Sequence, residues 1–336
     1  MNISILGAGT WGVALAALLS KNGCEVTVWS PIEREVASLD SSHEHPNLRG
    51  IPLPENIHYT TDIARAASFG EVVIFATPSS FMRSTAEIAA PHIRDGAIIA
   101  SASKGIERDT LMTMTDIIED VFAKARPELS YRIAALSGPT HAEEVAAGLP
   151  TSIVAASEDE EVSLALANLF ANSCLRVYTN PDVTGVEIAG ALKNVIAISA
   201  GINRGMGFGD NSGAMLITRG IAEITRLGLA MGCKRRTFMG LAGIGDLIVT
   251  CTSRHSRNNR CGEMIGRGMT YEEAQAEIGM VVEGYHALEA SMGLAEKYGV
   301  EMPITESVYS VIMKGESPSD ALHRLMNRDI KSELET

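Results

Sequence analysis

A glycine-rich turn near the start of the chain lies between a short apolar segment and a helix-forming one. Gly7, Gly9 and Gly12 have the G-x-G-x-x-G spacing within ISILGAGTWGVALAALLSKNGCEVTVWS. Residues 3–6 before the turn have the pattern of a buried strand, and residues 13–19 after it are rich in the helix formers Ala and Leu. EVTVWS then has the composition of a second strand. This order of elements is typical of a dinucleotide-binding unit.

Each glycine of the turn has a physical reason in such a unit. One makes the tight turn, one lets the backbone approach a pyrophosphate, and one lets the helix pack closely on the strand. The start of the helix then offers free N–H groups and a partial positive charge to the phosphates. We therefore predict that Gly7, Gly9 and Gly12 bind a dinucleotide; the alternative is a glycine turn used only for packing.

The end of the second strand bears on which dinucleotide is bound. Units that hold NAD usually have an acid there, about 20 residues after the turn, to bind the ribose hydroxyls, whereas this strand ends in VWSP. Ser30 and Arg34 could bind a 2′-phosphate, which favours NADP(H) and leaves NAD(H) possible. Glu33 and Glu35 flank the arginine and weaken this inference, and a solvated helix face explains IEREVA equally well.

Length and composition restrict the class of protein. The chain has 336 residues, enough for two domains, and 46% hydrophobic with 21% charged residues is typical of a globular protein. A net charge of -13 argues against general binding to nucleic acid or to anionic membranes, because both need a basic surface. Five scattered cysteines without a C-x-x-C pair favour reduced thiols and a cytoplasmic location.

No segment predicts a stable membrane insertion or a signal peptide. The longest apolar region, residues 188–202, is interrupted by Lys193 and Asn194 and is too short to cross a bilayer. The only His-rich segment, HEH at residues 43–45, is better explained as an exposed loop than as a metal site, so we predict no metal.

Strand-like and helix-like segments alternate over residues 1–181. The buried-strand patterns that lead into polar tips are EVVIFATPSS, GAIIASASKG and RIAALSGPT, and further strands are expected at TSIVAAS and LRVYTN. This predicts an α/β fold: an N-terminal Rossmann-type domain with a doubly wound, mostly parallel sheet that binds ligands at its carboxyl edge. Residues 182–336 read as an all-helical C-terminal substrate-binding and catalytic domain, with helices over 183–206, 212–231, 259–268, 284–298 and 303–314.

One helix of the second domain contains a lysine among small and apolar residues. In VEIAGALKNVIAISAGINRG, Lys193 is the only charged residue between Glu187 and Arg204. Burial lowers the pKa of a lysine, which is how lysines become acid–base catalysts near neutral pH. A buried structural ion pair is the alternative, and Asn194 beside the lysine favours a functional site.

A second isolated charge follows in GLAGIGDLIVTCTSRHSRNNRCG. Asp246 lies in an apolar, glycine-rich run, so we expect it to be buried and to pair with Lys193, with the Thr250 hydroxyl one helical turn further on. Ser256, Arg257 and Asn258 lie at an expected helix start, with Ser256 suited to capping, and an arginine beside free N–H groups is a phosphate site. A basic surface loop is the alternative, because Arg254, Arg257 and Arg260 cluster there.

Two loops of the first domain follow strands and could also meet a ligand. SASKG places Lys104 at the carboxyl end of the sheet, where its ammonium could reach substrate or cofactor. SGPTHAEEVAAG begins a helix whose leading N–H groups, near Gly138 and Thr140, could hold an anion.

The order and spacing of these motifs resemble the bacterial type of NAD(P)-dependent glycerol-3-phosphate dehydrogenase. The matching segments cover nearly the whole chain: GAGTWG, SKG, SGPTHAEEVAAGLPT, GALKNVIAI, GIGDLIVTCTSRHSRN, VVEGY and MPIT. The resemblance implies reversible reduction of dihydroxyacetone phosphate to sn-glycerol 3-phosphate, a phosphorylated small-molecule substrate, in support of glycerophospholipid synthesis. Where many such proteins carry a basic residue for the 2′-phosphate this chain has Ser30-Pro31, which leaves dual or NADH use open.

The resemblance also implies roles for individual residues. Lys193 would exchange the proton with Asp246 as its partner, and Lys104 joins them as a catalytic candidate. The predicted substrate site is Lys104, Gly138, Thr140, Lys193, Asn194, Asp246, Thr250, Ser256, Arg257 and Asn258. The predicted cofactor site is Gly7, Gly9, Thr10, Trp11, Gly12, Ser30, Arg34, Lys104, Ala142, Arg257, Val281 and Glu283.

Two other functions remain open from the sequence. A β-hydroxyacid or sugar-acid dehydrogenase would share both domains and the lysine but would act on a carboxylated substrate without a phosphate. A non-catalytic dinucleotide sensor would not explain why Lys193 and Asp246 are isolated in apolar helices. Composition does not fix the oligomeric state, and a homodimer is kept as one expectation.

Overall fold

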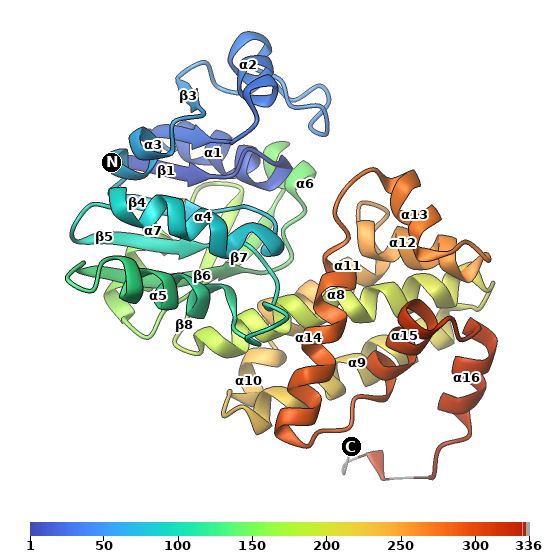
Figure 1. The fold of residues 1–336 in the computed structure, drawn as a ribbon. Helices are drawn as coiled ribbons and strands as arrows, with labels where there is room; N and C mark the ends of the chain where they lie inside the picture. Colours follow the sequence, from blue (N-terminus) through green and yellow to red (C-terminus); the bar gives the residue numbers. More distant parts are fainter. Residues whose placement is uncertain (331, 334–336) are drawn as a thin grey trace. The chain divides into compact units, whose positions relative to one another are not determined.

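A computed structural model of the chain describes residues 1–330, 332 and 333 (Figure 1). Contacts divide the chain into a sheet unit, Met1–Ser103 with Met112–Val183, and a helical unit, Lys104–Leu111 with the chain from Thr184 onward. The predicted domains, 1–181 and 182–336, differ from this division mainly in one segment. Residues 104–111 follow the fifth strand but pack in the helical unit, because Ile106 joins its apolar core.

The sheet unit contains an eight-stranded sheet in the order β3-β2-β1-β4-β5-β6-β7-β8. All neighbouring strands are parallel except β6 and β7. The predicted fold, a mostly parallel Rossmann-type sheet followed by a helical domain, is confirmed. The strands are β1 (Asn2–Leu6), β2 (Glu25–Trp29), β3 (Ile57–Thr60), β4 (Val72–Phe75), β5 (Ala97–Ser101), β6 (Tyr131–Ser137), β7 (Thr151–Ala156) and β8 (Leu175–Asn180).

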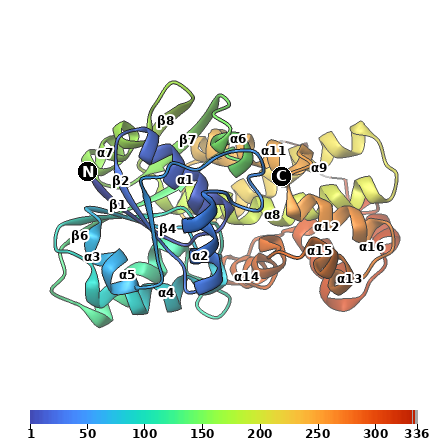
Figure 2. The same ribbon diagram turned by 90° about the horizontal axis from the view of Figure 1, so that it is seen from above.

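Helices cover both faces of this sheet, and Figure 2 shows α3, α4 and α5 on one side with α6 and α7 on the other. Strand β4 shows why its sequence is continuously apolar: Val72 and Ile74 join the core on one face, and Val73 and Phe75 join the core on the other. The helices are α1 (Thr10–Lys21), α2 (Glu33–Ser42), α3 (Ile63–Phe69), α4 (Met82–Ala89), α5 (Met114–Ala125), α6 (Ala142–Ala146) and α7 (Glu160–Phe170).

The helical unit is built around α8. The five helices predicted in this half are found as α8 (Val183–Gly205), α9 (Asp210–Ala230), α12 (Arg257–Gly266), α14 (Glu283–Tyr298) and α15 (Pro303–Lys314). Helix α11 (Asp246–Thr252) contains the helical turn expected from Asp246 to Thr250, whereas α10 (Arg235–Phe238), α13 (Tyr271–Ile278) and α16 (Pro318–Met326) were not predicted. A short π-helical segment, Leu241–Gly245, lies between α10 and α11.

Helix α8 is apolar because it is the core of this unit. By length and hydropathy it could cross a membrane, but 94% of its apolar window is buried inside the structure. One part of the helix packs against α9 and α14 through Leu192, and another packs against α12 through Ile198. Its composition is therefore explained by burial within the protein.

Helices α8 and α12 approach each other at backbone distance. A Cβ atom on Gly262 would lie 2.0 Å from the carbonyl oxygen of Ile198, and one on Gly201 would lie 2.1 Å from the carbonyl oxygen of Asn259. Only glycine permits this approach at these positions. The contact fixes the start of α12 relative to the helix that contains Lys193.

Candidate active site

Three charged side chains meet inside the helical unit. The Lys193 ammonium, from α8, donates to Oδ1 of Asp246 at the start of α11, and the Lys104 ammonium donates to Oδ2 at 2.6 Å. Lys193 also donates to the Thr250 hydroxyl at 2.8 Å. The predicted pair of Lys193 and Asp246 is present, and the structure adds Lys104 to it.

Burial and mutual charge determine the protonation of this cluster. Burial, opposed by the Asp246 carboxylate and assisted by the Lys104 ammonium, lowers the pKa of Lys193 to about 7. Burial raises the pKa of Asp246, but the two ammonium groups outweigh it and hold this pKa below its usual value. The carboxylate therefore stays ionised, and Lys193 is the member that exchanges a proton near neutral pH.

A chain of side-chain amides connects α8, at the residue after Lys193, to α12 and α14. Asn258 donates from Nδ2 to Oδ1 of Asn194 at 2.9 Å, and its own Oδ1 accepts from the Gly284 N–H at 2.9 Å. Both asparagines are buried. Two of the predicted substrate residues are thus held in place by each other and by the start of α14.

The start of α12 has the features of an anion site. Ser256 is the N-cap residue, as predicted, and its hydroxyl accepts from the Asn259 N–H at 3.2 Å. Arg257 donates to the carbonyl oxygen of Val281 at 3.0 Å, two residues before Glu283 begins α14. Helix N–H groups beside a guanidinium bind phosphate well. The structure therefore places the predicted phosphate residues beside two of the predicted cofactor residues.

In the sheet unit, the glycine turn joins β1 to α1. A Cβ atom on Gly12 would lie 2.0 Å from the carbonyl oxygen of Gly7, and one on Gly7 would lie 2.7 Å from the backbone of Ala76. Helix α1 begins at Thr10 with Gly9 as a cap that supplies no side-chain hydrogen bond. The N–H groups of Thr10 and Trp11 are therefore at a helix end suited to a pyrophosphate.

A loop that the sequence analysis interpreted as exposed also contacts this turn. His45 is buried, and its ring donates to the carbonyl oxygen of Ala8, while Asn47 donates from Nδ2 to the Thr10 hydroxyl at 3.0 Å. Burial lowers the pKa of His45, so the ring is held neutral. Both residues position the turn, and the HEH sequence alone gave no signal of this contact.

The two residues predicted to bind a 2′-phosphate differ in their surroundings. Ser30, directly after β2, is buried and its hydroxyl donates to the Glu35 carboxylate. Arg34 is exposed on α2. The Ser30 hydroxyl thus donates its proton to Glu35, whereas the prediction was donation to a 2′-phosphate.

The remaining predicted residues follow β6. The Thr140 hydroxyl donates to the carbonyl oxygen of Gly138 at 3.2 Å, and Ala142 begins the short helix α6. All three belong to the sheet unit, whereas Lys104 and Lys193 belong to the helical unit. The predicted substrate and cofactor sites therefore draw on residues of both units.

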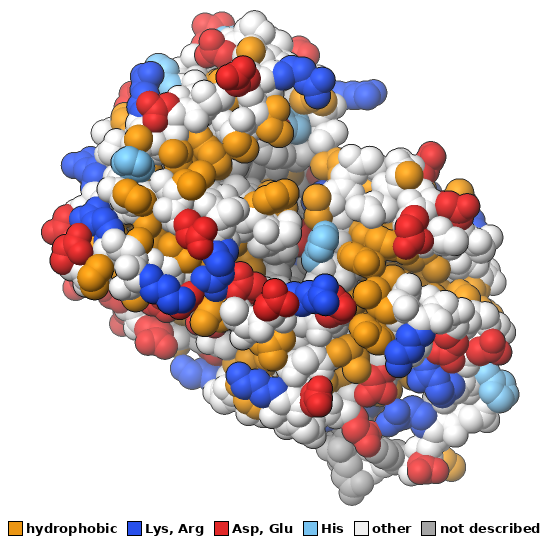
Figure 3. Space-filling view, viewed as in Figure 1, with side chains coloured by type: hydrophobic (Ala, Val, Ile, Leu, Met, Phe, Trp, Pro, Cys, Tyr) orange, Lys and Arg blue, Asp and Glu red, His pale blue; other side chains and the backbone are white. Residues whose placement is uncertain are grey.

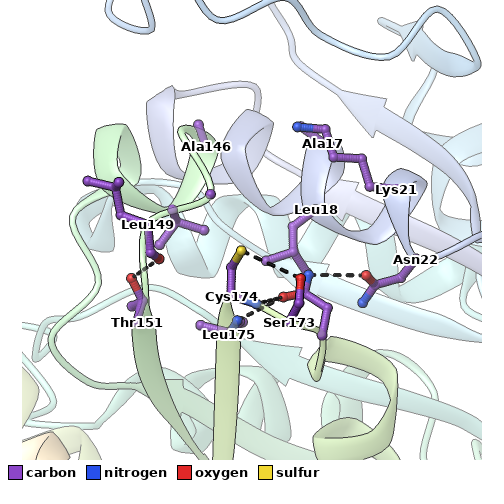
Figure 4. A pocket seen from close by; sticks show the side chains of 13 residues that line it. Ala17, Leu18, Lys21, Asn22, Ala146, Leu149, Thr151, Ser173, Cys174 and Leu175 are labelled. Atoms are coloured by element: carbon purple, nitrogen blue, oxygen red, sulfur yellow. Dashed lines mark hydrogen bonds between the residues drawn. The ribbon is translucent and has the colours of Figure 1, made fainter.

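A pocket of about 300 Å³ lies elsewhere in the sheet unit, between the end of α1 and the loops before β7 and β8 (Figure 4). Lys21, Leu149 and Cys174 are among its lining residues, and Asn172 accepts hydrogen bonds from the N–H groups of Cys174 and Leu175. It contains none of the predicted site residues, so the candidate active site does not include it.

Across residues 1–330, 332 and 333, no group of three or more His, Cys, Asp or Glu side chains is arranged to hold a metal ion.

Basic and acidic side chains are interspersed over the face in Figure 3. Among the predicted site residues, Lys104, Lys193 and Arg257 are the cations of the helical unit that could attract an anionic substrate.

Comparison with known proteins gives matches over nearly the whole chain. Residues 2–163 match the family model of the NAD-dependent glycerol-3-phosphate dehydrogenase N-terminus, and residues 182–323 match that of the C-terminus. A glycerol-3-phosphate dehydrogenase [NAD(P)+] of Lactobacillus delbrueckii subsp. bulgaricus is 52% identical over 99% of this chain and 98% of its own. One from Bacillus licheniformis is 46% identical over 99% of this chain and 96% of its own.

A solved structure gives the same result. The crystal structure of glycerol-3-phosphate dehydrogenase from Coxiella burnetii matches with a TM-score of 0.91 at 35% identity, and the match covers 97% of this chain and 99% of that one. The similarity therefore extends through both units.

Proposed function

Because the chain belongs to the NAD-dependent glycerol-3-phosphate dehydrogenase family, we propose that it reversibly reduces dihydroxyacetone phosphate to sn-glycerol 3-phosphate with NAD(P)H. The observation that carries this proposal is the buried cluster of Lys193, Asp246, Lys104 and Thr250. It supplies a proton donor that titrates near neutral pH, as reduction of a ketone requires.

The cofactor would be held by the glycine turn and the start of α1. Gly7 and Gly12 permit the close packing of the turn, the space beside Gly9 leaves room for a pyrophosphate, and the N–H groups of Thr10 and Trp11 would bind it. When bound, the reduced nicotinamide supplies a hydride for the ketone carbon. The residues beyond the turn, Ala142, Val281 and Glu283, are proposed to complete the cofactor site.

Lys193 is the proposed proton donor. As the hydride reaches the ketone carbon, the C=O bond becomes a C–O bond and negative charge develops on the oxygen. The Lys193 ammonium stabilises that charge and then gives it a proton. Asp246 and Thr250 orient the ammonium, and Lys104 keeps the carboxylate paired when Lys193 becomes neutral. In the reverse direction neutral Lys193 accepts the hydroxyl proton.

The phosphate of the substrate is proposed to bind at the start of α12. Arg257 has guanidinium N–H groups beyond the one that donates to Val281, and the leading N–H groups of the helix add to them. Asn258 and Asn194 hold this end of α12 against α8. Binding energy from the phosphate would thus orient the ketone towards Lys193.

The test is oxidation of NADH, and separately of NADPH, with dihydroxyacetone phosphate or unphosphorylated dihydroxyacetone. We expect turnover that depends on the phosphate, and Arg257→Ala should raise KM for dihydroxyacetone phosphate roughly 10- to 100-fold, as loss of a charge-assisted hydrogen bond of about 1.5–3 kcal/mol implies. The same change should leave the low rate with dihydroxyacetone nearly unaltered. Folded protein that binds NAD(P)H but reduces only carboxylated ketones would instead be a hydroxyacid dehydrogenase.

We further propose a cytoplasmic enzyme that supplies glycerol 3-phosphate for glycerophospholipids. Among the described residues no disulfide joins any of the five cysteines, which is consistent with a reducing compartment. A homodimer stays a prediction, and sedimentation of the purified protein would test it.

A further inference from the structure

The first turn of α2 folds an acidic side chain back onto the tip of β2. Glu35 is half-buried, and its Oε2 accepts a hydrogen bond from the Ser30 hydroxyl. The Ser30 oxygen also accepts from the Ile32 N–H at 3.2 Å, and the Ser30 side chain is 2% exposed. Strand β2 has no acid at its own end, but Glu35 supplies a carboxylate at that place from the next helix.

The hydrogen bonds of Ser30 restrict what it can offer to a ligand. A serine hydroxyl has one proton to donate, and here that proton goes to Glu35. Donation to a 2′-phosphate would therefore require Ser30 to release a charge-assisted hydrogen bond to a half-buried carboxylate. Ser30 is poorly suited to read a 2′-phosphate as long as Glu35 is ionised.

The position of Glu35 relative to the glycine turn identifies what it faces. The Gly7 N–H donates to the carbonyl oxygen of Trp29, the last residue of β2, at 2.9 Å, so the turn and the strand tip are neighbours. His45, which donates to Ala8 in the same turn, is close enough to Glu35 for their charges to interact. In a Rossmann unit the adenosine ribose of the dinucleotide lies at this tip.

Charge at this tip favours a ribose hydroxyl over a phosphate. A carboxylate accepts hydrogen bonds from 2′-OH and 3′-OH groups, but it repels the negative charge of a 2′-phosphate. The first turn of α2 contains two acids, Glu33 and Glu35, and one cation, Arg34, which is exposed. The neutral ring of His45 adds no positive charge beside Glu35.

We propose that Glu35 is a specificity-determining residue that makes NADH the preferred cofactor of this chain by binding the adenosine ribose and repelling the 2′-phosphate. The proposal rests on the proposed function only in that a dinucleotide binds at the glycine turn. It reverses the preference for NADP(H) that Ser30 and Arg34 suggest from sequence alone.

The experiment measures dissociation constants of NADH and NADPH by nicotinamide fluorescence, with the full chain and without dihydroxyacetone phosphate. We expect the wild-type protein to bind NADH at least tenfold more tightly than NADPH. Glu35→Gln keeps the shape and an acceptor for Ser30 but removes the charge, so it should reduce this ratio at least fivefold. Glu35→Asp, which keeps the charge, should keep the preference for NADH.

Two matched variants separate the role of Glu35 from general charge effects. Glu33→Gln makes the same charge change on an exposed residue of the same turn and should alter the ratio less than twofold. Arg34→Ala tests the competing assignment, in which Arg34 binds the 2′-phosphate. Loss of that contact would weaken the binding of NADPH alone by fivefold or more, whereas we expect the ratio of the two dissociation constants to change less than twofold.

The outcomes are distinguishable from failure of the proposed function. Three results would overturn the role of Glu35, even if dihydroxyacetone phosphate is reduced. The wild-type protein could bind NADPH more tightly than NADH, Glu35→Gln could change the ratio of dissociation constants less than fivefold, or Glu33→Gln could change this ratio as much as Glu35→Gln does. If the protein shows the predicted binding ratios but no turnover, that result would count against the proposed reaction and leave Glu35 as the residue that selects NADH over NADPH.

Discussion

The sheet unit and the helical unit build their candidate ligand-binding groups differently, the first mainly from backbone atoms and the second from side chains. In the sheet unit, the dinucleotide turn consists mainly of backbone, and Gly7 and Gly12 are needed because a Cβ atom would collide with other backbone atoms. In the helical unit, the candidate catalytic groups are side chains, and the Asp246 carboxylate inside an apolar core is compensated by the ammonium groups of Lys193 and Lys104. The first site depends on backbone shape, and the second on buried charge.

This difference predicts different consequences of substitution. A backbone site fails when added atoms displace the turn, so binding is lost together with some stability. Removal of one member of a buried charge cluster stops the reaction, and the protein still folds only if the remaining charges are paired. Substitutions in the two units should therefore separate binding from turnover.

The largest effect is expected from Lys193→Met, which removes the proton donor but keeps a side chain of similar length. Asp246 would still be paired with Lys104, so the variant should fold. We expect kcat for reduction of dihydroxyacetone phosphate to fall at least about 10³-fold, within the range for a lost general acid. The dissociation constant of NADH should change less than twofold, because Lys193 is not among the residues predicted to bind the cofactor.

Lys297→Met is the matched control, because Lys297 is an exposed lysine on α14 of the same unit. Its turnover should equal that of the wild-type protein. Appreciable turnover by Lys193→Met, with circular dichroism showing a folded protein, would remove Lys193 from the proposed mechanism.

The next largest effect is expected from Gly12→Ala, where the new Cβ atom would lie 2.0 Å from the carbonyl oxygen of Gly7. Overpacking of this kind costs about 1–3 kcal/mol, so the dissociation constant of NADH should rise roughly 5- to 100-fold. At saturating NADH the KM for dihydroxyacetone phosphate should be nearly unchanged. Titration by fluorescence measures the dissociation constant of NADH, and a denaturation midpoint measures the stability of the variant.

Gly9→Ala sharpens this test, because apart from the chain neighbours of Gly9 no atom of the described residues lies within 4 Å of a Cβ atom at this position. Its stability should equal that of the wild-type protein, and any loss of affinity would come from contact with the cofactor. Equal loss of stability in both variants would show that the turn is needed for folding and would not support a specific fit to a ligand.

The sequence predicted best the features that depend on neighbouring residues. The strands, the glycine turn and α8 follow from local periodicity and composition, because each apolar run must be buried and each glycine lies where a turn is needed. The pairing of Lys193 with Asp246 was also predictable, because two lone charges in apolar helices need each other.

Features that depend on the path of the chain between elements were not predictable in this way. The Lys104 segment follows a strand of the sheet but packs with the helical unit through Ile106. Glu35 appeared as one of several charges on a solvated helix, since its hydrogen bond to Ser30 depends on how α2 leaves β2. His45 appeared as part of a polar loop, although a backbone carbonyl of the turn accepts its ring N–H.

The smallest expected effect is a change of rate with pH, and it has opposite signs in the two directions of the reaction. The pKa of Lys193 is lowered by burial to about 7, reduction needs its ammonium form, and oxidation needs its neutral form. We therefore expect kcat/KM for reduction to be flat below pH 7 and to fall about tenfold per pH unit above it. For oxidation of glycerol 3-phosphate, kcat/KM should rise tenfold per pH unit towards pH 7 and then level off.

Lys104→Met sharpens this prediction within the charge cluster. The Lys104 ammonium lowers the pKa of Lys193 by repulsion, so its removal leaves Asp246 as the stronger influence and raises that pKa. The bend in both profiles should move to higher pH, even if KM also rises through loss of the proposed contact between Lys104 and the substrate. A bend that stays near pH 7 in this variant, or the same sign of pH dependence in both directions, would mean that a group other than Lys193 exchanges the proton.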